Sequence, residues 1–110
     1  MVLECNTDPN VVDRFSGGTP LHHAVEQQNL TMAKCLLLQC NADPNIADFC
    51  GDTPLHGAVR KNKLEVAQCL MFCGNANILC ENTQGFTPLS LASTNMGIRI
   101  FTDMLRRLDK

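Results

Sequence analysis

Two histidines that recur at a fixed spacing are the residues of this sequence best suited to chemistry. His22 and His56 are 34 positions apart (56 − 22 = 34), and each follows a threonine by three positions. An imidazole can activate a serine, cysteine or threonine nucleophile when a third side chain orients it. No Ser, Cys or Asp recurs with the two histidines at a spacing that would make such a relay. The pattern therefore favours a structural role for both side chains.

Cysteines are the second group of reactive side chains. The chain has seven, an odd number that cannot all pair within it. A zinc site built from Cys69, Cys73 and Cys80 would lack the paired short spacings of a zinc ribbon or finger. Cys35 and Cys69 stand 34 positions apart in an apolar pattern, as small buried hydrophobes do. We therefore expect reduced structural thiols and no metal.

Motifs of other catalytic classes are missing from the sequence. It has no Gly-rich phosphate loop with a lysine, no pair of histidines with a glutamate on one helix, and no paired carboxylates in a shared apolar setting. We therefore predict that the chain is not an enzyme and holds no cofactor.

Charge and hydropathy argue against two classes of partner. The net charge is −2, so the chain lacks the concentrated excess of Lys and Arg with which a nucleic-acid binder displaces counterions. Its longest apolar runs, such as residues 35–38, are far too short to cross a bilayer, and the N-terminus does not resemble a signal peptide. We expect an intracellular protein, cytoplasmic or nuclear, that binds neither nucleic acid nor membrane.

The two histidines belong to a longer stretch that occurs three times. Residues 17–25, 51–59 and 85–93 read GGTPLHHAV, GDTPLHGAV and GFTPLSLAS. Their Thr-Pro pairs are 34 residues apart (53 − 19 = 34 and 87 − 53 = 34). A fixed period of this size is typical of a chain that stacks copies of one supersecondary unit.

Each copy predicts two helices joined by a short turn. Threonine is a good N-cap and proline suits the first helical position, so a helix should begin at Pro20, Pro54 and Pro88. In the middle copy this helix ends after about two turns, at Lys61-Asn62. A second apolar stripe, residues 64–71, ends near Cys73-Gly74, where Gly can supply a left-handed cap. The intervening segments 41–51 and 75–85 are rich in Asn, Asp and Gly, which indicates turn-tipped fingers instead of strands.

These features together resemble a known family. The middle copy, with Ala42-Asp43-Pro44-Asn45, Thr53-Pro54-Leu55-His56 and Leu64-Glu65-Val66-Ala67, is similar to an ankyrin repeat. The resemblance implies an all-α ankyrin-repeat solenoid of stacked helix-turn-helix hairpins with β-hairpin-like fingers. It also implies that His22 and His56 are structural pins within and between repeats. Residues 16–30 further resemble repeats of the inhibitor-of-NF-κB group.

The resemblance divides one domain, residues 1–110, into four parts. Residues 1–16 would be the end of a preceding repeat and the first finger, residues 17–50 and 51–84 the first two repeats, and residues 85–110 a third repeat with a C-terminal capping helix. Residues 1–10 match residues 36–45, so the chain is expected to belong to a longer array or a multidomain protein. Its uncapped N-terminal repeat could also support self-association. The apolar stripe of the capping helix consists of Ile98, Phe101, Leu105 and Leu108.

In this family, finger residues and the exposed ends of the first helices line one concave face. Exposed aromatic residues are typical interface anchors, although each finger phenylalanine could instead pack against its neighbouring finger. Arg60 and Lys61 favour a partner with an acidic segment opposite the middle repeat. Carried over residue by residue, the candidate protein-binding residues are Arg14, Phe15, His23, Glu26, Gln27, Asp48, Phe49, Asp52, Arg60, Lys61, Thr83, Gln84, Phe86, Thr94 and Asn95.

Three functions are compatible with these observations. The first is a non-catalytic module that presents the concave face and finger tips to a protein partner. The second is a regulatory inhibitor or adaptor of the inhibitor-of-NF-κB type. The third is an ankyrin spacer segment within a larger enzyme, such as a ubiquitin ligase.

Overall fold

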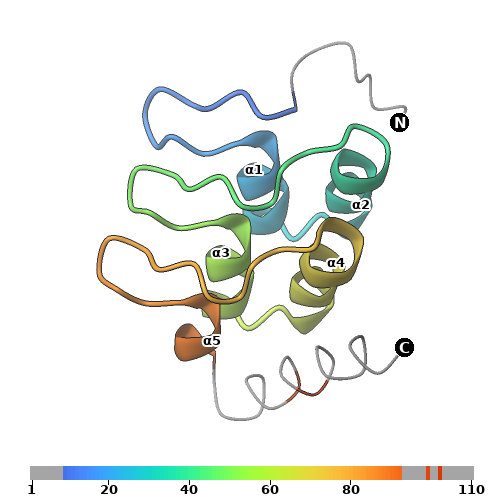
Figure 1. Cartoon of the computed structure of the whole chain (residues 1–110). Coiled ribbons are helices and arrows are strands. Elements are labelled where there is room, and N and C mark those ends of the chain that lie inside the picture. Colours follow the sequence, from blue (N-terminus) through green and yellow to red (C-terminus); the bar gives the residue numbers. More distant parts are fainter. Residues whose placement is uncertain (1–8, 93–98, 100–101, 103–110) are drawn as a thin grey trace.

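The computed structural model describes residues 9–92, together with Arg99 and Thr102 (Figure 1). Within these residues it contains helices and no strand, and long loops project from one side of the molecule. The predicted all-α fold with β-hairpin-like fingers is therefore confirmed. The candidate residues Thr94 and Asn95 and the apolar stripe of the expected capping helix lie outside the described residues. The helices are α1 (Pro20–Glu26), α2 (Leu30–Leu38), α3 (Pro54–Arg60), α4 (Leu64–Gly74) and α5 (Pro88–Leu91).

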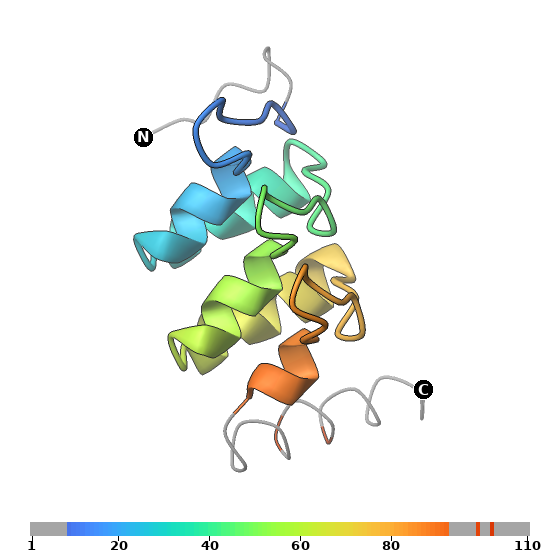
Figure 2. The same cartoon turned by 90° about the vertical axis from the view of Figure 1, so that its left-hand side faces the viewer.

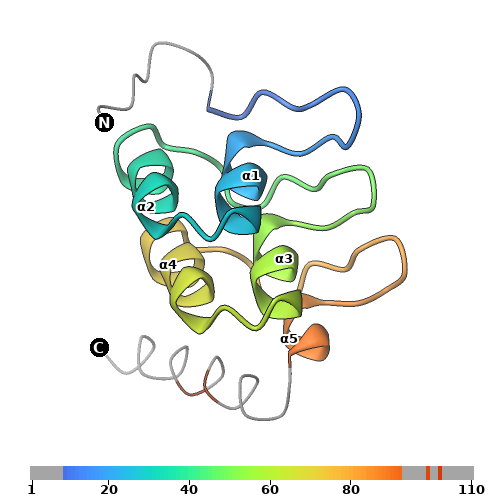
Figure 3. The same ribbon diagram turned by 180° about the vertical axis from the view of Figure 1, so that it is seen from behind.

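The helices form two layers that follow the repeats. In Figure 2, turned so that the fingers face the viewer, α1, α3 and α5 lie one below another. Seen from behind in Figure 3, α2 and α4 form the second layer. The core between the layers includes Leu21, Leu55 and Leu70, none of which has any exposed surface. Buried alanines such as Ala58 and Ala67 allow the helices to approach closely.

The starts of α1, α3 and α5 follow from their Thr-Pro pairs, as predicted. Each threonine has extended backbone dihedrals, and the proline after it occupies the first helical turn. The Thr19 hydroxyl accepts a hydrogen bond from the His22 main-chain N–H (3.3 Å), and the Thr87 hydroxyl accepts one from the Ser90 N–H (3.0 Å). These bonds satisfy donors that the first helical turn cannot pair internally.

A residue with left-handed backbone follows each of the helices α1 to α4, and three of these four residues are asparagines. Asn62, which follows α3, has a φ of 59°, as its tolerance of left-handed backbone predicts. The expectation that Gly74 would supply the left-handed cap of α4 is wrong, because Gly74 is the last helical residue and Asn75 has a φ of 57°. The glycine is needed for packing: an added Cβ would lie 2.6 Å from Leu37 Cδ2 and 3.2 Å from Pro44 Cγ.

The cysteines differ from the expectation at one position. Cys40 is buried at the end of the first repeat and is disulfide-bonded, so reduced thiols were wrongly expected there. The other described cysteines are free, at positions 35, 50, 69, 73 and 80.

Candidate functional site

The recurring histidines connect each repeat to the next. The Thr53 main-chain N–H donates to His56 Nδ1 (3.0 Å), so in a neutral imidazole the proton lies on Nε2. Nε2 then donates to the carbonyl of Phe86 in the third repeat (2.9 Å). His56 is fully buried and both of its ring nitrogens are satisfied. The same two bonds recur one repeat earlier among Thr19, His22 and Asp52.

The third repeat departs from this arrangement. Ser90 stands in place of the histidine, accepts from the Thr87 N–H (2.8 Å) and donates to the Thr87 carbonyl (2.9 Å). Its short side chain thus stays within its own repeat. These bonds agree with the structural role predicted for His22 and His56. The hydroxyl that lies 2.9 Å from each Nδ1 belongs to the threonine that begins the same helix, and both threonines are buried.

Each finger is closed by a side chain that accepts hydrogen bonds from its own turn. Asp48 Oδ1 accepts from the main-chain N–H groups of Cys50 (2.9 Å) and Asp52 (3.0 Å). Such turns fix the direction in which the finger tip points. Comparable turns form around Asp13 and Asn82.

Neighbouring fingers are also bonded to one another at their tips. The Phe49 N–H donates to the Ser16 carbonyl (2.8 Å). The Thr83 N–H and hydroxyl both donate to the Cys50 carbonyl, at 3.1 and 2.9 Å. The fingers therefore form one continuous surface beside the layer of α1, α3 and α5.

The three finger phenylalanines have different surroundings. Phe15 is 93% exposed, whereas Phe49 is 64% and Phe86 is 45% exposed. The Phe49 ring lies against the preceding finger, where a Cβ added to Gly17 would be 2.6 Å from its Cδ1. Phe49 therefore packs against a neighbouring finger, which was one of the two alternatives for the finger phenylalanines. Phe15 fits the other alternative, an exposed aromatic side chain.

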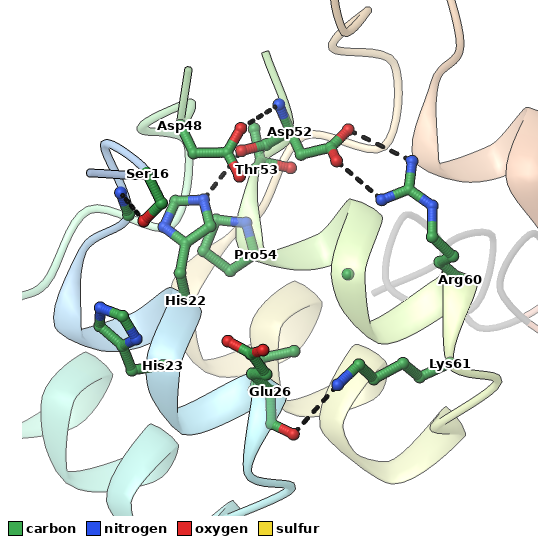
Figure 4. Close-up of a pocket in the computed structure, with 13 residues that line it drawn as sticks. Ser16, His22, His23, Glu26, Asp48, Asp52, Thr53, Pro54, Arg60 and Lys61 are labelled. Carbon is green, nitrogen blue, oxygen red and sulfur yellow. Dashed lines mark hydrogen bonds and ion pairs between the residues drawn. The ribbon is translucent and has the colours of Figure 1, made fainter. Parts of the chain in front are cut away.

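A pocket of about 250 Å³ lies between α1, α3 and the first two fingers (Figure 4). Its floor is apolar, with buried Val25 and Pro54 beside Gly57. Charged and polar side chains stand around this floor. The remaining lining residues are Ser16, Gly18, His22, His23, Glu26, Asp48, Asp52, Thr53, Arg60 and Lys61.

Arg60 is held in an ion pair at the edge of this pocket. Its Nη1 lies 2.7 Å from Asp52 Oδ2, and Asn82 Nδ2 donates to Asp52 Oδ1 (2.9 Å). Partial burial acts to raise the pKa of Asp52, but the hydrogen bonds from Arg60 and Asn82 outweigh it and lower the pKa below its ordinary value. The negative charge of Asp52 therefore largely balances the positive charge of Arg60.

Lys61 and Glu26 meet on the opposite side of the pocket. Lys61 Nζ donates to the main-chain carbonyl of Glu26 (3.2 Å). Figure 4 shows the Glu26 carboxylate directed away from Lys61, toward the middle of the pocket and the histidines. His23 borders the same space, and its Nε2 lies 3.7 Å from Asp13 Oδ2. A hydrogen bond from the Phe15 N–H, the main cause, lowers the pKa of Asp13.

The structure brings only part of the predicted set together. Six of the candidates line the pocket: His23, Glu26, Asp48, Asp52, Arg60 and Lys61. Gln27 follows α1 and is exposed. Arg14, Phe15, Phe49, Thr83, Gln84 and Phe86 are exposed on the fingers.

One contributor to this face was missed from the sequence, and the bond made by another, a finger residue, was not foreseen. Gly57 forms part of the pocket floor, and Asn82 links the third finger to Asp52. The occurrence of Gly57 where the neighbouring copies have His23 and Leu91 is a signal that could have revealed the first. Nothing local in the sequence indicates the bond of Asn82, because the two residues are 30 positions apart.

Two other kinds of site were sought in the same residues. Within residues 9–92, with Arg99 and Thr102, no group of three or more His, Cys, Asp and Glu side chains is placed to hold a metal ion. No helix of the described part is long and apolar enough to span a membrane.

Comparisons with known proteins agree with this architecture. A family model described as ankyrin repeats (3 copies) matches residues 1–82 and 32–108. The nuclear factor NF-kappa-B p105 subunit of Gallus gallus is 39% identical over 51 residues, which are 46% of this chain and 5% of that protein. The crystal structure of the ankyrin repeat domain of Bcl-3, described as a unique member of the IkappaB protein family, has a TM-score of 0.81 and 34% identity. That match covers 88% of this chain and 42% of the Bcl-3 chain.

These matches extend the resemblance seen in the sequence. The similarity of residues 16–30 to inhibitor-of-NF-κB repeats is supported by both the p105 and the Bcl-3 matches, although the chain spans less than half the length of either protein. Ankyrin repeats are generally protein–protein interaction modules. Since the family model matches nearly the full length in three copies, this chain belongs to the ankyrin-repeat family.

Proposed function

We propose that this chain is a non-catalytic protein-binding module whose contact surface is the face formed by α1, α3 and the fingers. The observation that carries the proposal is Phe15, whose side chain is 93% exposed at the tip of the first finger. An exposed aromatic ring contributes little to folding, whereas such residues commonly anchor protein interfaces. The finger-to-finger hydrogen bonds support it, because a pre-ordered surface loses little entropy on binding.

A capture experiment with matched variants tests this proposal. One variant carries Phe15→Ala and Phe86→Ala, and leaves Phe49 in place because its ring packs on the preceding finger. The control carries Leu38→Ala and Phe72→Ala, which remove apolar surface from α2 and α4 in the other layer. We expect the finger variant to lose protein partners that the wild-type chain and the control retain. Retention of every partner would instead support a spacer within a larger enzyme.

The ion pair between Arg60 and Asp52 refines where an acidic segment of the partner is expected to bind. The acidic segment expected opposite Arg60 and Lys61 stays a prediction, and Lys61 is its better anchor because Asp52 already neutralises Arg60. Reversal of Lys61 to Glu should weaken binding by such a segment and should make the remaining affinity less sensitive to salt. An unchanged affinity would count against an acidic segment at this position.

A regulatory protein of the IkappaB type is the second candidate, favoured by the similarity to Bcl-3 and p105. Its partner would be a nuclear factor NF-kappa-B subunit, and the chain would act in the cytoplasm or nucleus. Titration of the full chain against purified NF-kappa-B subunits tests this candidate directly. Submicromolar binding that is lost in the finger variant would support it, and no binding at tens of micromolar would reject it.

A further inference from the structure

Gly57 is not required by the fold. It lies inside α3 with helical backbone, and an added Cβ would meet only Val25 Cγ1, at the ordinary contact distance of 3.7 Å. A glycine within a helix destabilises it relative to alanine. The equivalent positions of the neighbouring repeats carry His23 and Leu91, so the same fold accommodates large side chains there. Gly57 therefore has a cost in stability that no packing constraint explains.

The consequence of this glycine is an open floor in the pocket between α1 and α3. Without a side chain at Gly57, the space above it is bordered by Val25 and Pro54, both buried. A partner's side chain could thus lie directly on the backbone of α3. The floor offers apolar contact and no hydrogen-bonding side chain of its own.

The charges around the floor favour a cation over an anion. Three carboxylates, Glu26, Asp48 and Asp52, face two cations, Arg60 and Lys61, which gives a formal charge of −1. The ion pair with Arg60 neutralises Asp52, and the ammonium of Lys61 is directed at a main-chain carbonyl.

The carboxylates of Glu26 and Asp48 then face the ammonium of Lys61. Asp48 Oδ1 already accepts from two main-chain N–H groups of its own turn, so Glu26 is the carboxylate left without a bond. It points into the pocket and makes no hydrogen bond or ion pair with the described residues (Figure 4). A carboxylate inside the pocket would be repelled by Glu26 and Asp48, so an acidic segment of the partner that contacts Lys61 must stay at the rim. A wholly apolar side chain would bury Glu26 without giving it a partner, which is unfavourable.

We propose that this pocket receives a lysine or arginine side chain of the protein partner, an inference that rests on the binding face proposed above. The aliphatic stem lies over Gly57 between Val25 and Pro54, and the cationic head pairs with the Glu26 carboxylate. Long basic side chains commonly bury their methylene stem on apolar surface while the charge stays at a polar rim. A charge-assisted hydrogen bond at the rim fixes the register of the partner along the groove.

Peptide selection tests this assignment without a known partner. A library of random 12-residue peptides displayed on phage is selected against the full 110-residue chain. The affinities of the recovered peptides are measured for wild type and for the variants Gly57→Leu, Glu26→Gln and Phe15→Ala, after circular dichroism has checked that all three stay folded. We expect the peptides to share a Lys or Arg and to bind Gly57→Leu and Glu26→Gln at least about tenfold more weakly, with a similar loss when that residue of the peptide becomes norleucine.

The outcomes separate this inference from the proposed function. Peptides that lose affinity for Phe15→Ala but bind Gly57→Leu as tightly as wild type would overturn the pocket assignment and leave the binding face in place. Selected residues that are acidic or purely apolar, with sensitivity to Gly57→Leu, would overturn the choice of a basic side chain. Peptides insensitive to all three variants, or no selected peptide at all, would count against both proposals.

Discussion

Asp52 is the residue at which three elements of the binding face meet. Its carboxylate accepts from Arg60 of α3 and from Asn82 of the third finger, and its main-chain carbonyl accepts from His22 of α1. The side chain is therefore part of the scaffold as well as of the pocket rim. Its candidate role in binding stays a prediction, whereas its role in joining adjacent repeats follows from these bonds.

Asp52→Asn should make the chain less sensitive to acid. Because its pKa is lower in the folded chain than the ordinary 3.8, the carboxylate contributes stability above that value and loses it as the pH falls through the folded pKa. The stability gap between wild type and the variant should therefore be largest near pH 7 and shrink toward pH 3. Urea unfolding across this range measures it, with the exposed Glu65→Gln as a control. A gap that does not change with pH would contradict the prediction.

The free cysteines should differ in reactivity. Burial, together with neighbouring Cys73, raises the pKa of Cys69 to about 11, so its reactive thiolate is scarce at pH 8. Cys50 is exposed on the second finger. In a time course with iodoacetamide followed by mass spectrometry, we expect Cys50 to be alkylated early and Cys69 only after unfolding. Equal rates in the native chain would show that α4 opens readily.

At the scale of elements, the glycines of α3 and α4 occur in their helices for different reasons. Gly74 ends α4 where Leu37 and Pro44 leave no room for a Cβ, while Gly57 lies in α3 with ordinary contacts. One residue type therefore serves packing in one helix and opens a pocket in the other.

The same substitution should have opposite effects at these two positions. Gly74→Ala should destabilise the chain by about 1–3 kcal/mol, because Leu37 is buried and Pro44 is rigid and neither can move away easily. Gly57→Ala should stabilise it by up to about 1 kcal/mol through helix propensity. Denaturant unfolding of the two variants measures both. A loss of stability at Gly57 would indicate a packing constraint and would weaken the pocket inference.

Local features of these elements could be predicted from the sequence, and long-range contacts could not. The Thr-Pro helix starts and the left-handed Asn62 depend on residue types within a few positions. The role of His56 between repeats was expected from the resemblance to ankyrin repeats, since its bond to Phe86 spans 30 positions. Gly74 was misassigned because its neighbours Leu37 and Pro44 belong to the preceding repeat. The ion pair of Arg60 was missed because the sequence shows only that Arg60 and Lys61 are adjacent positive charges. It does not show that the Asp52 carboxylate, eight residues earlier in the finger, lies against Arg60.

At the scale of the whole molecule, identical bonds recur while the face varies. The Thr-Pro helix starts recur in all three copies and the histidine bonds in the first two, which gives the stack its regular spacing. The pocket and finger tips differ between copies, at His23, Gly57 and Leu91 for example. In such an array stability comes from each repeat and its interfaces with neighbours, so specificity is free to reside in the varying positions.

Leu55→Ala should therefore lower the stability of the whole chain, because Leu55 belongs to the core and cannot contact a partner directly. Leu55 is fully buried between repeats, and its truncation should cost about 2–5 kcal/mol through the cavity that it leaves. For a chain of this length that is a large share of the total stability. Urea unfolding should show an earlier transition, and a loss below about 1 kcal/mol would mean that the core collapses around the site.

Site-specific photo-crosslinking tests the central claim, that the face of α1, α3 and the fingers binds another protein, most directly. A photoreactive phenylalanine analogue is placed at Phe15 or His23 on that face, or at Leu38 or Phe72 on the other layer, and the full chain is irradiated in an extract of the cells that express it. We predict that both face positions crosslink to the same protein and that the two outer positions do not. Equal or stronger crosslinking of that protein from Leu38 and Phe72 would contradict the proposed function.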